Sequence, residues 1–137
     1  MYRTELIHEA ILARKKAYCP YSHFAEGAAL LGENGKVYHG CNVENASYGA
    51  GNCAERTAVY SAIAQGERKF TAIAVVGGYE AHPLPFETYA FPCGVCRQVL
   101  WELGGPNLHI IVAKSEDDYQ EYKLGELLPK AFGDQMK

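Results

Sequence analysis

The chain has 137 residues, of which 48% are hydrophobic and 21% are charged, and its formal charge at pH 7 is −3. This length and composition predict one globular domain over residues 1–137 with a buried core, and they exclude an intrinsically disordered chain. The sequence has no lysine- or arginine-rich run. A basic nucleic-acid footprint is therefore excluded, and a small-molecule ligand is favoured.

The cysteine content and the absence of long apolar runs indicate in which cellular compartment the protein is expected. No stretch has the apolar length expected of a signal peptide or a membrane span. Five cysteines are an odd number for a disulfide framework, so metal binding or catalysis is the better expectation for them. We therefore expect a cytoplasmic protein with neither a membrane nor a nucleic acid as its partner.

Helices and strands are expected to alternate along the chain. Apolar residues from Leu6 to Tyr18 follow helical spacing, and Pro20 is expected to end this first helix. The later elements follow from apolar runs and from turn signals such as Asn34-Gly35. In chain order they are strands at 27–31 and 36–44, a helix at 53–65, a strand at 70–76 ended by Gly77-Gly78, a helix at 93–103, strands at 109–113 and 120–123, and a helical turn at 125–128.

This order of elements predicts an α/β fold. The β-α-β steps should be right-handed crossovers, which place their helices on the faces of one sheet. A mixed sheet of about five strands with helices on both faces is therefore expected.

Two short motifs carry the chemistry, Cys53-Ala54-Glu55 and, after forty residues, Pro92-Cys93-Gly94-Val95-Cys96. Three cysteine ligands on tetrahedral Zn²⁺ leave one position for water, which is the arrangement of a catalytic zinc. A metal-bound water can ionise near neutral pH. A ligand-x-Glu segment followed by Pro-Cys-x-x-Cys is also the pattern of the zinc-dependent deaminases.

The spacing of these residues predicts where each motif lies on its helix. Cys93 and Cys96 are three residues apart and share one face of a helix start. Cys53 and Glu55 are roughly 200° apart around a helix, so they can serve one site only at the helix mouth. The preceding residues 49–52 support that position, since they have the composition of a loop and an N-cap. Both helix N-termini would then direct partial positive charge at the thiolates.

Three further residue roles are expected near these motifs. Glu55 would carry protons between the zinc-bound water and the substrate. Arg56 would donate hydrogen bonds to sulfur, because three thiolates leave the Zn²⁺ centre with a net negative charge that weakens it as a Lewis acid. Asn42 and Glu44 project from one face of a strand, either as a clamp for a substrate or as an exposed strand end.

Two other interpretations of the cysteines use fewer of these residues. A thioredoxin-like redox pair would need nothing from Cys53 or Glu55. A structural zinc would need a fourth ligand, and neither Cys19, Cys41 nor any of the five histidines has a usual ligand spacing from the pair. A non-catalytic, zinc-stabilised binding module is the alternative from a different functional class.

Six ordered segments of the chain resemble the cytidine deaminases of the small, zinc-dependent, homotetrameric type, over nearly the whole length. These segments are YCPYSHF (18–24), GAALL (27–31), GCNVENASY (40–48), CAERTA (53–58), PCGVCRQVL (92–100) and LLPKAFG (127–133). The resemblance implies a three-layer α-β-α sandwich with a mixed five-stranded sheet in the order 2-1-3-4-5. It also implies the hydrolysis of cytidine and 2′-deoxycytidine to uridine and 2′-deoxyuridine with release of ammonia, a reaction of pyrimidine salvage.

The resemblance also implies a role for individual residues. The ligands of one Zn²⁺ per subunit would be Cys53, Cys93 and Cys96. Glu55 would be the general acid and base, with Arg56 beside the cysteines. The substrate contacts would be Asn42 and Glu44 to the ribose 3′-hydroxyl, Phe24 and Ala54 to the pyrimidine, and Phe132 from a neighbouring subunit of a homotetramer.

The chain departs from the family pattern at a few positions. Phe91 replaces a serine before the second motif, Glu26 stands where an apolar residue is common, and His23 stands where lysine or arginine is frequent. The preceding loop, residues 78–91, is long and rich in aromatic residues. It is either a variable surface loop or a wall near the site. A wall would favour a modified cytosine nucleoside, such as an aminoacylnucleoside antibiotic, whereas Asn42 and Glu44 favour an unmodified ribose.

Overall fold

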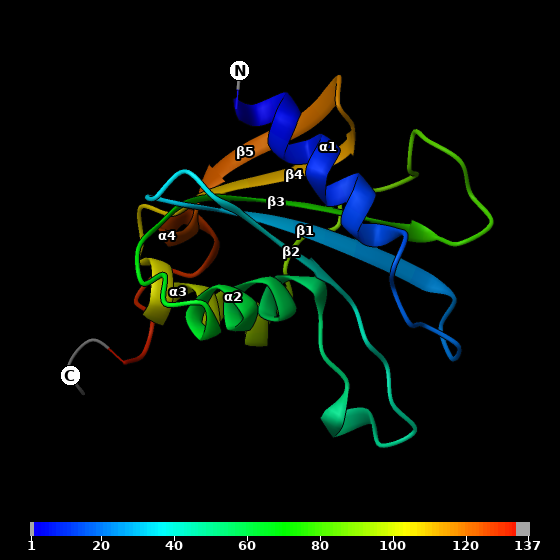
Figure 1. Cartoon of the computed structure of the whole chain (residues 1–137), viewed down its shortest axis with the longest axis horizontal. Helices are drawn as coiled ribbons and strands as arrows, with labels where there is room; N and C mark the ends of the chain where they lie inside the picture. Colours follow the sequence, from blue (N-terminus) through cyan, green and yellow to red (C-terminus); the bar gives the residue numbers. More distant parts are fainter. Residues whose placement is uncertain (1, 134–137) are drawn as a thin grey trace.

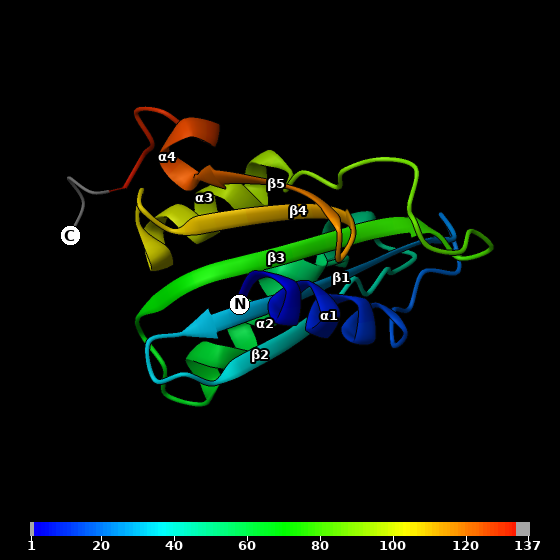
Figure 2. The ribbon, with the colours of Figure 1, turned by 90° about the horizontal axis from the view of Figure 1, so that it is seen from above.

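A five-stranded mixed sheet lies between helices on both faces in the computed structural model, which describes residues 2–133 (Figures 1 and 2). The sheet order is β2-β1-β3-β4-β5. The predicted three-layer α/β sandwich and its strand order are therefore confirmed. The elements are α1 (Tyr2–Arg14), β1 (Phe24–Gly32), β2 (Val37–Cys41), η1 (Tyr48–Ala50), α2 (Ala54–Ala64), β3 (Phe70–Tyr79), α3 (Gly94–Gly104), β4 (His109–Ser115), β5 (Asp118–Lys123) and α4 (Leu124–Leu127).

The strand pairing follows the chain connections. β1 is antiparallel to both β2 and β3, and β4 is antiparallel to β5. β3 and β4 are parallel, with Ala72 opposite His109, and the connection between them carries α3. Such a pair requires a crossover, as the sequence order indicated. No helix within residues 2–133 is both long enough and apolar enough to cross a membrane.

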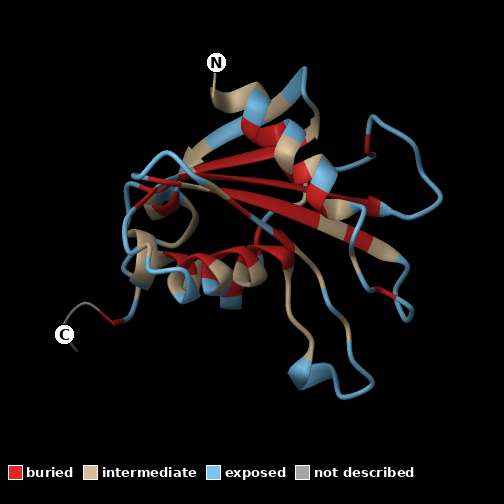
Figure 3. Ribbon diagram, viewed as in Figure 1, coloured by how far each residue is buried: buried red, intermediate tan, exposed pale blue. Residues whose placement is uncertain are grey.

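Each face of the sheet has its own buried cluster (Figure 3). α1 contributes Leu6, Ile7 and Ala10 to the cluster on one face, where they meet mostly alanines of β1, β3 and β4, together with Val76 and Ile111. α2 and α3 cover the opposite face with Ala54, Ala58, Val59, Ala62 and Leu100, among others. Small side chains predominate at these contacts, so the helices lie close to the sheet.

Two glycines allow this close approach. A Cβ on Gly27 of β1 would lie 2.1 Å from the carbonyl oxygen of Ala10 in α1. A Cβ on Gly40 of β2 would lie 2.2 Å from the carbonyl oxygen of Ala54 and 2.5 Å from the amide nitrogen of Ala58. Gly40 therefore sets how closely the first turn of α2 lies against the sheet.

Two predicted boundaries are wrong for identifiable reasons. The first helix ends at Arg14 rather than near Pro20, because Tyr18 instead bridges Val43 in parallel and donates its N–H to the carbonyl of Asn42. The second strand ends at Cys41 rather than at residue 44. Beyond it, Val43 also pairs with Asn52 and so belongs to the segment that projects from the sheet towards α2 (Figure 1).

A third difference concerns Gly77 and Gly78, which were predicted to end a strand but lie inside β3. A Cβ on Gly77 would lie 2.8 Å from the ring of Phe24, and a Cβ on Gly78 would lie 2.7 Å from the ring of Phe86. Adjacent residues of a strand face opposite sides of the sheet. The two glycines therefore make room for one aromatic ring on each face.

We expect Gly40→Ala to lower the free energy of unfolding by about 1–3 kcal/mol, because the added methyl group overlaps the backbone of α2. Urea denaturation measures the change as a shift in midpoint. Gly49→Ala is the matched control, since no heavy atom lies within 4 Å of a Cβ there. Its effect should stay within about 0.5 kcal/mol. Equal stability of the two variants would contradict the role given to Gly40.

Candidate active site

Two helix N-termini meet at the site. Cys53 is the N-cap of α2 and Cys93 is the N-cap of α3, and both have extended backbones. The first helical residues are Ala54 and Gly94. Cys53 itself, rather than the preceding asparagine, therefore takes the cap position. Its extended backbone lets it serve the same site as Glu55, as the spacing predicted.

The three predicted metal ligands lie together. The sulfur atoms of Cys53, Cys93 and Cys96 are all within 4.8 Å of one another, and the Cys53 and Cys93 sulfurs are 4.0 Å apart. Tetrahedral Zn²⁺ with bonds of about 2.3 Å to sulfur places two sulfurs about 3.8 Å apart. Soft thiolates are also the donors that favour zinc over magnesium or calcium. The cluster therefore fits Zn²⁺ in both geometry and donor type.

The thiols differ in exposure and in pKa. Cys96 is buried, Cys53 is half-buried and Cys93 is exposed. Hydrogen bonding from Cys96, together with that from Arg56, lowers the pKa of Cys53 to about 5. The same interaction and burial raise the pKa of Cys96. In the metal-free protein, Cys53 thus ionises before Cys96, which keeps its proton.

Arg56 lies beside the cluster, as predicted. Its Nη2 donates to the Cys53 sulfur at 3.6 Å. Burial opposes its charge, but hydrogen bonds to Cys53 and Cys96 raise its pKa above the ordinary value. The Nε of Arg56 is buried without a hydrogen-bond partner among residues 2–133. The guanidinium remains a cation that offsets thiolate charge.

Glu55 is the one buried charged residue within the described chain, with only 1% of its surface exposed. Neither of its carboxylate oxygens has a hydrogen-bond partner among residues 2–133. Burial, followed by the charge of Glu26, raises the pKa of Glu55 well above its usual range. An unpartnered buried carboxyl is costly, so its retention beside a metal-binding cluster indicates a partner that the protein alone does not supply.

Glu26 is the site residue that the sequence analysis did not assign to the site. It lies on β1, and its Oε1 accepts the backbone N–H of Ala54 at 3.0 Å. Burial is the largest cause that raises its pKa, to about 6. The available signal was strand periodicity, because Phe24, Glu26 and Ala28 share one face. Ala28 belongs to the cluster beneath α2, so this face points towards the zinc-binding helix.

A cleft of about 450 Å³ joins most of the predicted substrate contacts to the metal-binding end of α2. Its lining residues are Ser22, Phe24, Glu26, Asn42, Val43, Glu44, Tyr48, Gly51, Asn52, Cys53 and Arg56. Phe24, Asn42 and Glu44 are thus brought together beside Cys53. Phe132 is not among the lining residues and is 63% exposed, and its carbonyl accepts the side chain of Gln98.

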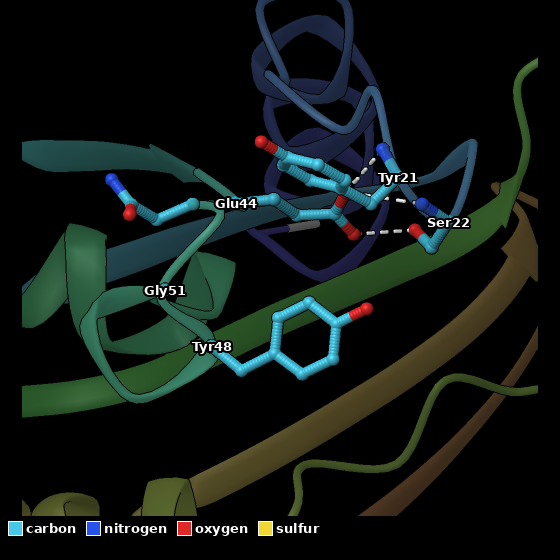
Figure 4. Close-up of a pocket in the computed structure, with 6 residues that line it drawn as sticks. Tyr21, Ser22, Glu44, Tyr48 and Gly51 are labelled. Atoms are coloured by element: carbon cyan, nitrogen blue, oxygen red, sulfur yellow. Dashed lines mark hydrogen bonds between the residues drawn. The ribbon is translucent and has the colours of Figure 1, made fainter.

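Two polar residues of the cleft, Asn42 and Glu44, are held by hydrogen bonds. The Oδ1 of Asn42 accepts the N–H of Glu26, and its Nδ2 donates to the carbonyl of Phe24, each at 2.8 Å. Glu44 accepts the backbone N–H groups of Tyr21 and Ser22 and the Ser22 hydroxyl (Figure 4). The Ser22 hydroxyl bond is the largest cause that lowers the pKa of Glu44. Both side chains are therefore fixed before any ligand binds.

The aromatic loop predicted at residues 78–91 instead comprises residues 80–92, because Gly78 and Tyr79 belong to β3. Phe86 is buried on the α1 face, where Arg14 lies 4.5 Å above its ring and the Phe86 N–H donates to the carbonyl of Lys114. Phe91 contacts the ring of Tyr122. None of the residues lining the 450 Å³ cleft comes from this loop. Near the site, the loop shares a cavity of about 60 Å³ with Phe24, and its Tyr89 and Ala90 pack against the buried cluster beneath α2 and α3.

Comparison with known proteins gives the family. Residues 2–112 match the family model of the cytidine and deoxycytidylate deaminase zinc-binding region. The chain therefore belongs to this family of zinc-dependent deaminases. The predicted family, enzyme class and zinc cofactor are confirmed.

Relatives and solved structures agree over nearly the full length. The cytidine deaminase of Halalkalibacterium halodurans is 49% identical over 132 residues, which cover 96% of this chain and 95% of the relative. The crystal structure of cytidine deaminase from Burkholderia pseudomallei is 51% identical, with a TM-score of 0.87 over 96% of this chain and 100% of that one. The Mycobacterium tuberculosis enzyme is 43% identical, with a TM-score of 0.79 over 94% and 95% of the two chains.

We expect Cys53 to be alkylated by iodoacetamide in the metal-free protein at a pH far below the ordinary thiol pKa of about 8.5, because its lowered pKa makes it a thiolate earlier in a titration. Mass spectrometry of peptides across a pH series measures the midpoint. Cys41, whose pKa is raised by burial, is the internal reference. Arg56→Ala should move the Cys53 midpoint to higher pH. Identical midpoints for Cys53 and Cys41 would contradict this account of the cluster.

Proposed function

We propose that the chain hydrolyses the 4-amino group of cytidine and 2′-deoxycytidine, giving uridine or 2′-deoxyuridine and ammonia. The observation that carries the proposal is the buried, unpartnered carboxyl of Glu55 beside three converging thiols at the end of a cleft. Names of close relatives support the substrate class, since several of them are cytidine deaminases. Family membership and the buried acid favour an enzyme over a zinc-stabilised binding module.

In this proposal Cys53, Cys93 and Cys96 hold Zn²⁺, which when bound supplies a water of lowered pKa as the nucleophile. Glu55 accepts one proton from the attacking water as the oxygen–carbon 4 bond forms and transfers it to the ring N3. It then takes the second proton from the hydroxyl group now on carbon 4 and gives it to the amine, which leaves as ammonia when the bond between carbon 4 and nitrogen breaks. Its raised pKa suits a group that must both accept and donate a proton near neutral pH. Arg56 keeps its positive charge on the cysteine side of the site.

Asn42 and Glu44 are proposed to bind the ribose 3′-hydroxyl. Asn42 uses one N–H and one lone pair on β1, so a second N–H and a second lone pair remain for a ligand. The lowered pKa of Glu44 keeps it ionised at neutral pH, and a carboxylate is a strong acceptor for a hydroxyl group. Because the aromatic loop adds no residue to the cleft, nothing there favours a modified nucleoside over the simple one.

Phe24 and Ala54 are proposed to contact the base. The Phe24 ring lines the cleft and packs edge-on against Tyr79 at 5.3 Å between centroids. Ala54 is buried at the first turn of α2 and its backbone N–H is bonded to Oε1 of Glu26, so its contact with the base would involve this N–H and the Glu26 carboxyl group together. A ring against the pyrimidine and polar groups at its edge are a usual way to read a base.

We also propose a homotetramer in the cytoplasm in which Phe132 of one subunit stacks in the site of another. Support comes from large apolar side chains that are exposed on the single chain. Tyr48 is 84% exposed, and Phe132, Val95 and Tyr60 are 63%, 58% and 48% exposed. Tyr48 also lines the cleft, so a neighbouring subunit that covers it would complete the wall of the site. Five free thiols suit a reducing compartment.

Glu55→Gln should keep the zinc content of the wild type and lower kcat for cytidine by about 10²–10⁴-fold, because the amide cannot carry the proton. Loss of absorbance as cytidine becomes uridine measures the rate, and elemental analysis measures zinc. Glu33→Gln, on an exposed turn, is the matched control and should match the wild type. Full activity in Glu55→Gln would exclude the role assigned to the carboxyl.

Phe132→Ala should raise KM for cytidine about 2–10-fold, which corresponds to the binding free energy of one aromatic contact. Light scattering should still give a tetramer. Leu12→Ala, at an exposed site on α1, should leave KM unchanged. Tetramers mixed from Phe132→Ala and Glu55→Gln subunits should recover part of the wild-type KM, because an intact Phe132 then enters sites with an intact Glu55. Failure of the mixture to recover it would argue that the sites are not shared.

A further inference from the structure

The carboxyl group of Glu26 accepts a hydrogen bond from a backbone N–H at the centre of the site. Its Oε1 accepts the Ala54 N–H at 3.0 Å. The Asn42 side chain accepts the N–H of Glu26 itself and donates to the carbonyl of Phe24, and so fixes this end of β1. The side chain also lines the 450 Å³ cleft with Cys53 and Arg56. Glu26 is thus held between the start of α2 and the space proposed for the substrate.

The Ala54 N–H matters because of its place in the chain. It lies between Cys53, a proposed metal ligand, and Glu55, the proposed acid and base. The first N–H groups of a helix have no partner within the helix, and the Cys53 side chain makes no capping bond. A cytosine with its C4 at the metal presents N3 and the 2-carbonyl along the same edge, and both are acceptors. If it were free, the Ala54 N–H, next to Cys53 in the chain, would be a backbone donor for such an edge.

Resting on the proposed function, we propose that Glu26 determines specificity at position 2 of the pyrimidine. Its carboxyl group accepts the Ala54 N–H, which is then not available to the substrate. The same carboxyl group would lie against the edge of the base that carries the 2-carbonyl. In either protonation state the carboxyl group accepts the Ala54 N–H and keeps this donor from the 2-carbonyl. The chain should therefore gain less from a strong acceptor at position 2 than it would with the Ala54 N–H free, and it should tolerate a weak acceptor such as a 2-thiocarbonyl better.

A purely structural role would give a different result. Glu26 could act only as a cap for the first turn of α2, supplied from β1. In that case Glu26→Gln, which keeps an accepting oxygen, should be neutral. Glu26→Val should then weaken all pyrimidine ligands alike. A specificity role instead changes the ratio between ligands that differ only at position 2.

The test uses the zinc-loaded full chain, Glu26→Gln, Glu26→Val and the control Glu33→Gln. It measures kcat/KM for cytidine and 2-thiocytidine, and calorimetric affinities for uridine and 2-thiouridine, which need no turnover. In Glu26→Gln the side-chain N–H₂ can donate to the 2-carbonyl, and in Glu26→Val the Ala54 N–H is free to do so. In both variants the preference for the 2-oxo ligand should rise about 2–10-fold, the value of one hydrogen bond.

Unchanged 2-oxo to 2-thio ratios in both variants would overturn the inference, even if Glu26→Val were less stable or held less zinc. The proposed function fails separately. If no protein releases ammonia from cytidine but the affinity ratios for uridine and 2-thiouridine shift as expected, the deaminase proposal falls and the role of Glu26 stands. If no protein, wild type or variant, binds any nucleoside, both proposals fall.

Discussion

The contact between Gly40 and the first turn of α2 is the constraint on which the site depends. Without a side chain at Gly40, the carbonyl of Ala54 and the amide of Ala58 come to within van der Waals reach of β2. This contact sets the distance between β2 and the first turn of α2. Cys53 is then still extended while Glu55 is already helical, and both reach one space. The sheet therefore positions the Glu55 carboxyl group, the proposed proton carrier, relative to the thiols before a metal binds.

The same narrow space concentrates charge. Three thiols, Glu55 and Glu26 gather around two helix N-termini, with Arg56 as the nearby cation. Hydrogen bonding from Cys96, together with that from Arg56, lowers the pKa of Cys53, whereas burial raises the pKa values of Glu55 and Glu26. The environment thus favours the ionised form of a thiol and the protonated form of carboxyls that lie close to it. A divalent cation in this space would relieve the remaining repulsion.

Sequence patterns predicted what depends on local spacing, and they failed where distant side chains decide. The Cys53–Glu55 interval was sufficient to place both at a helix mouth, and the β-α-β order was sufficient for the mixed sheet. Gly77 and Gly78 were predicted as a strand end, because the rings that occupy their space lie 53 residues before and 8 residues after them. Glu26 was noted only as unusual, since its partner Ala54 is 28 residues away. The shared-site role of Phe132 still rests on resemblance.

Gly77 and Gly78 make β3 locally thin, with the ring of Phe24 on one surface and the ring of Phe86 on the other. Phe24 faces the cleft, and Phe86 belongs to the aromatic loop on the far side. A change in the loop that moves Phe86 can therefore displace the backbone of β3 and, with it, the Phe24 ring, against which the base is proposed to lie. Loop sequence and length can drift during evolution and retune the fit of the nucleoside, while both metal-binding helices stay as they are.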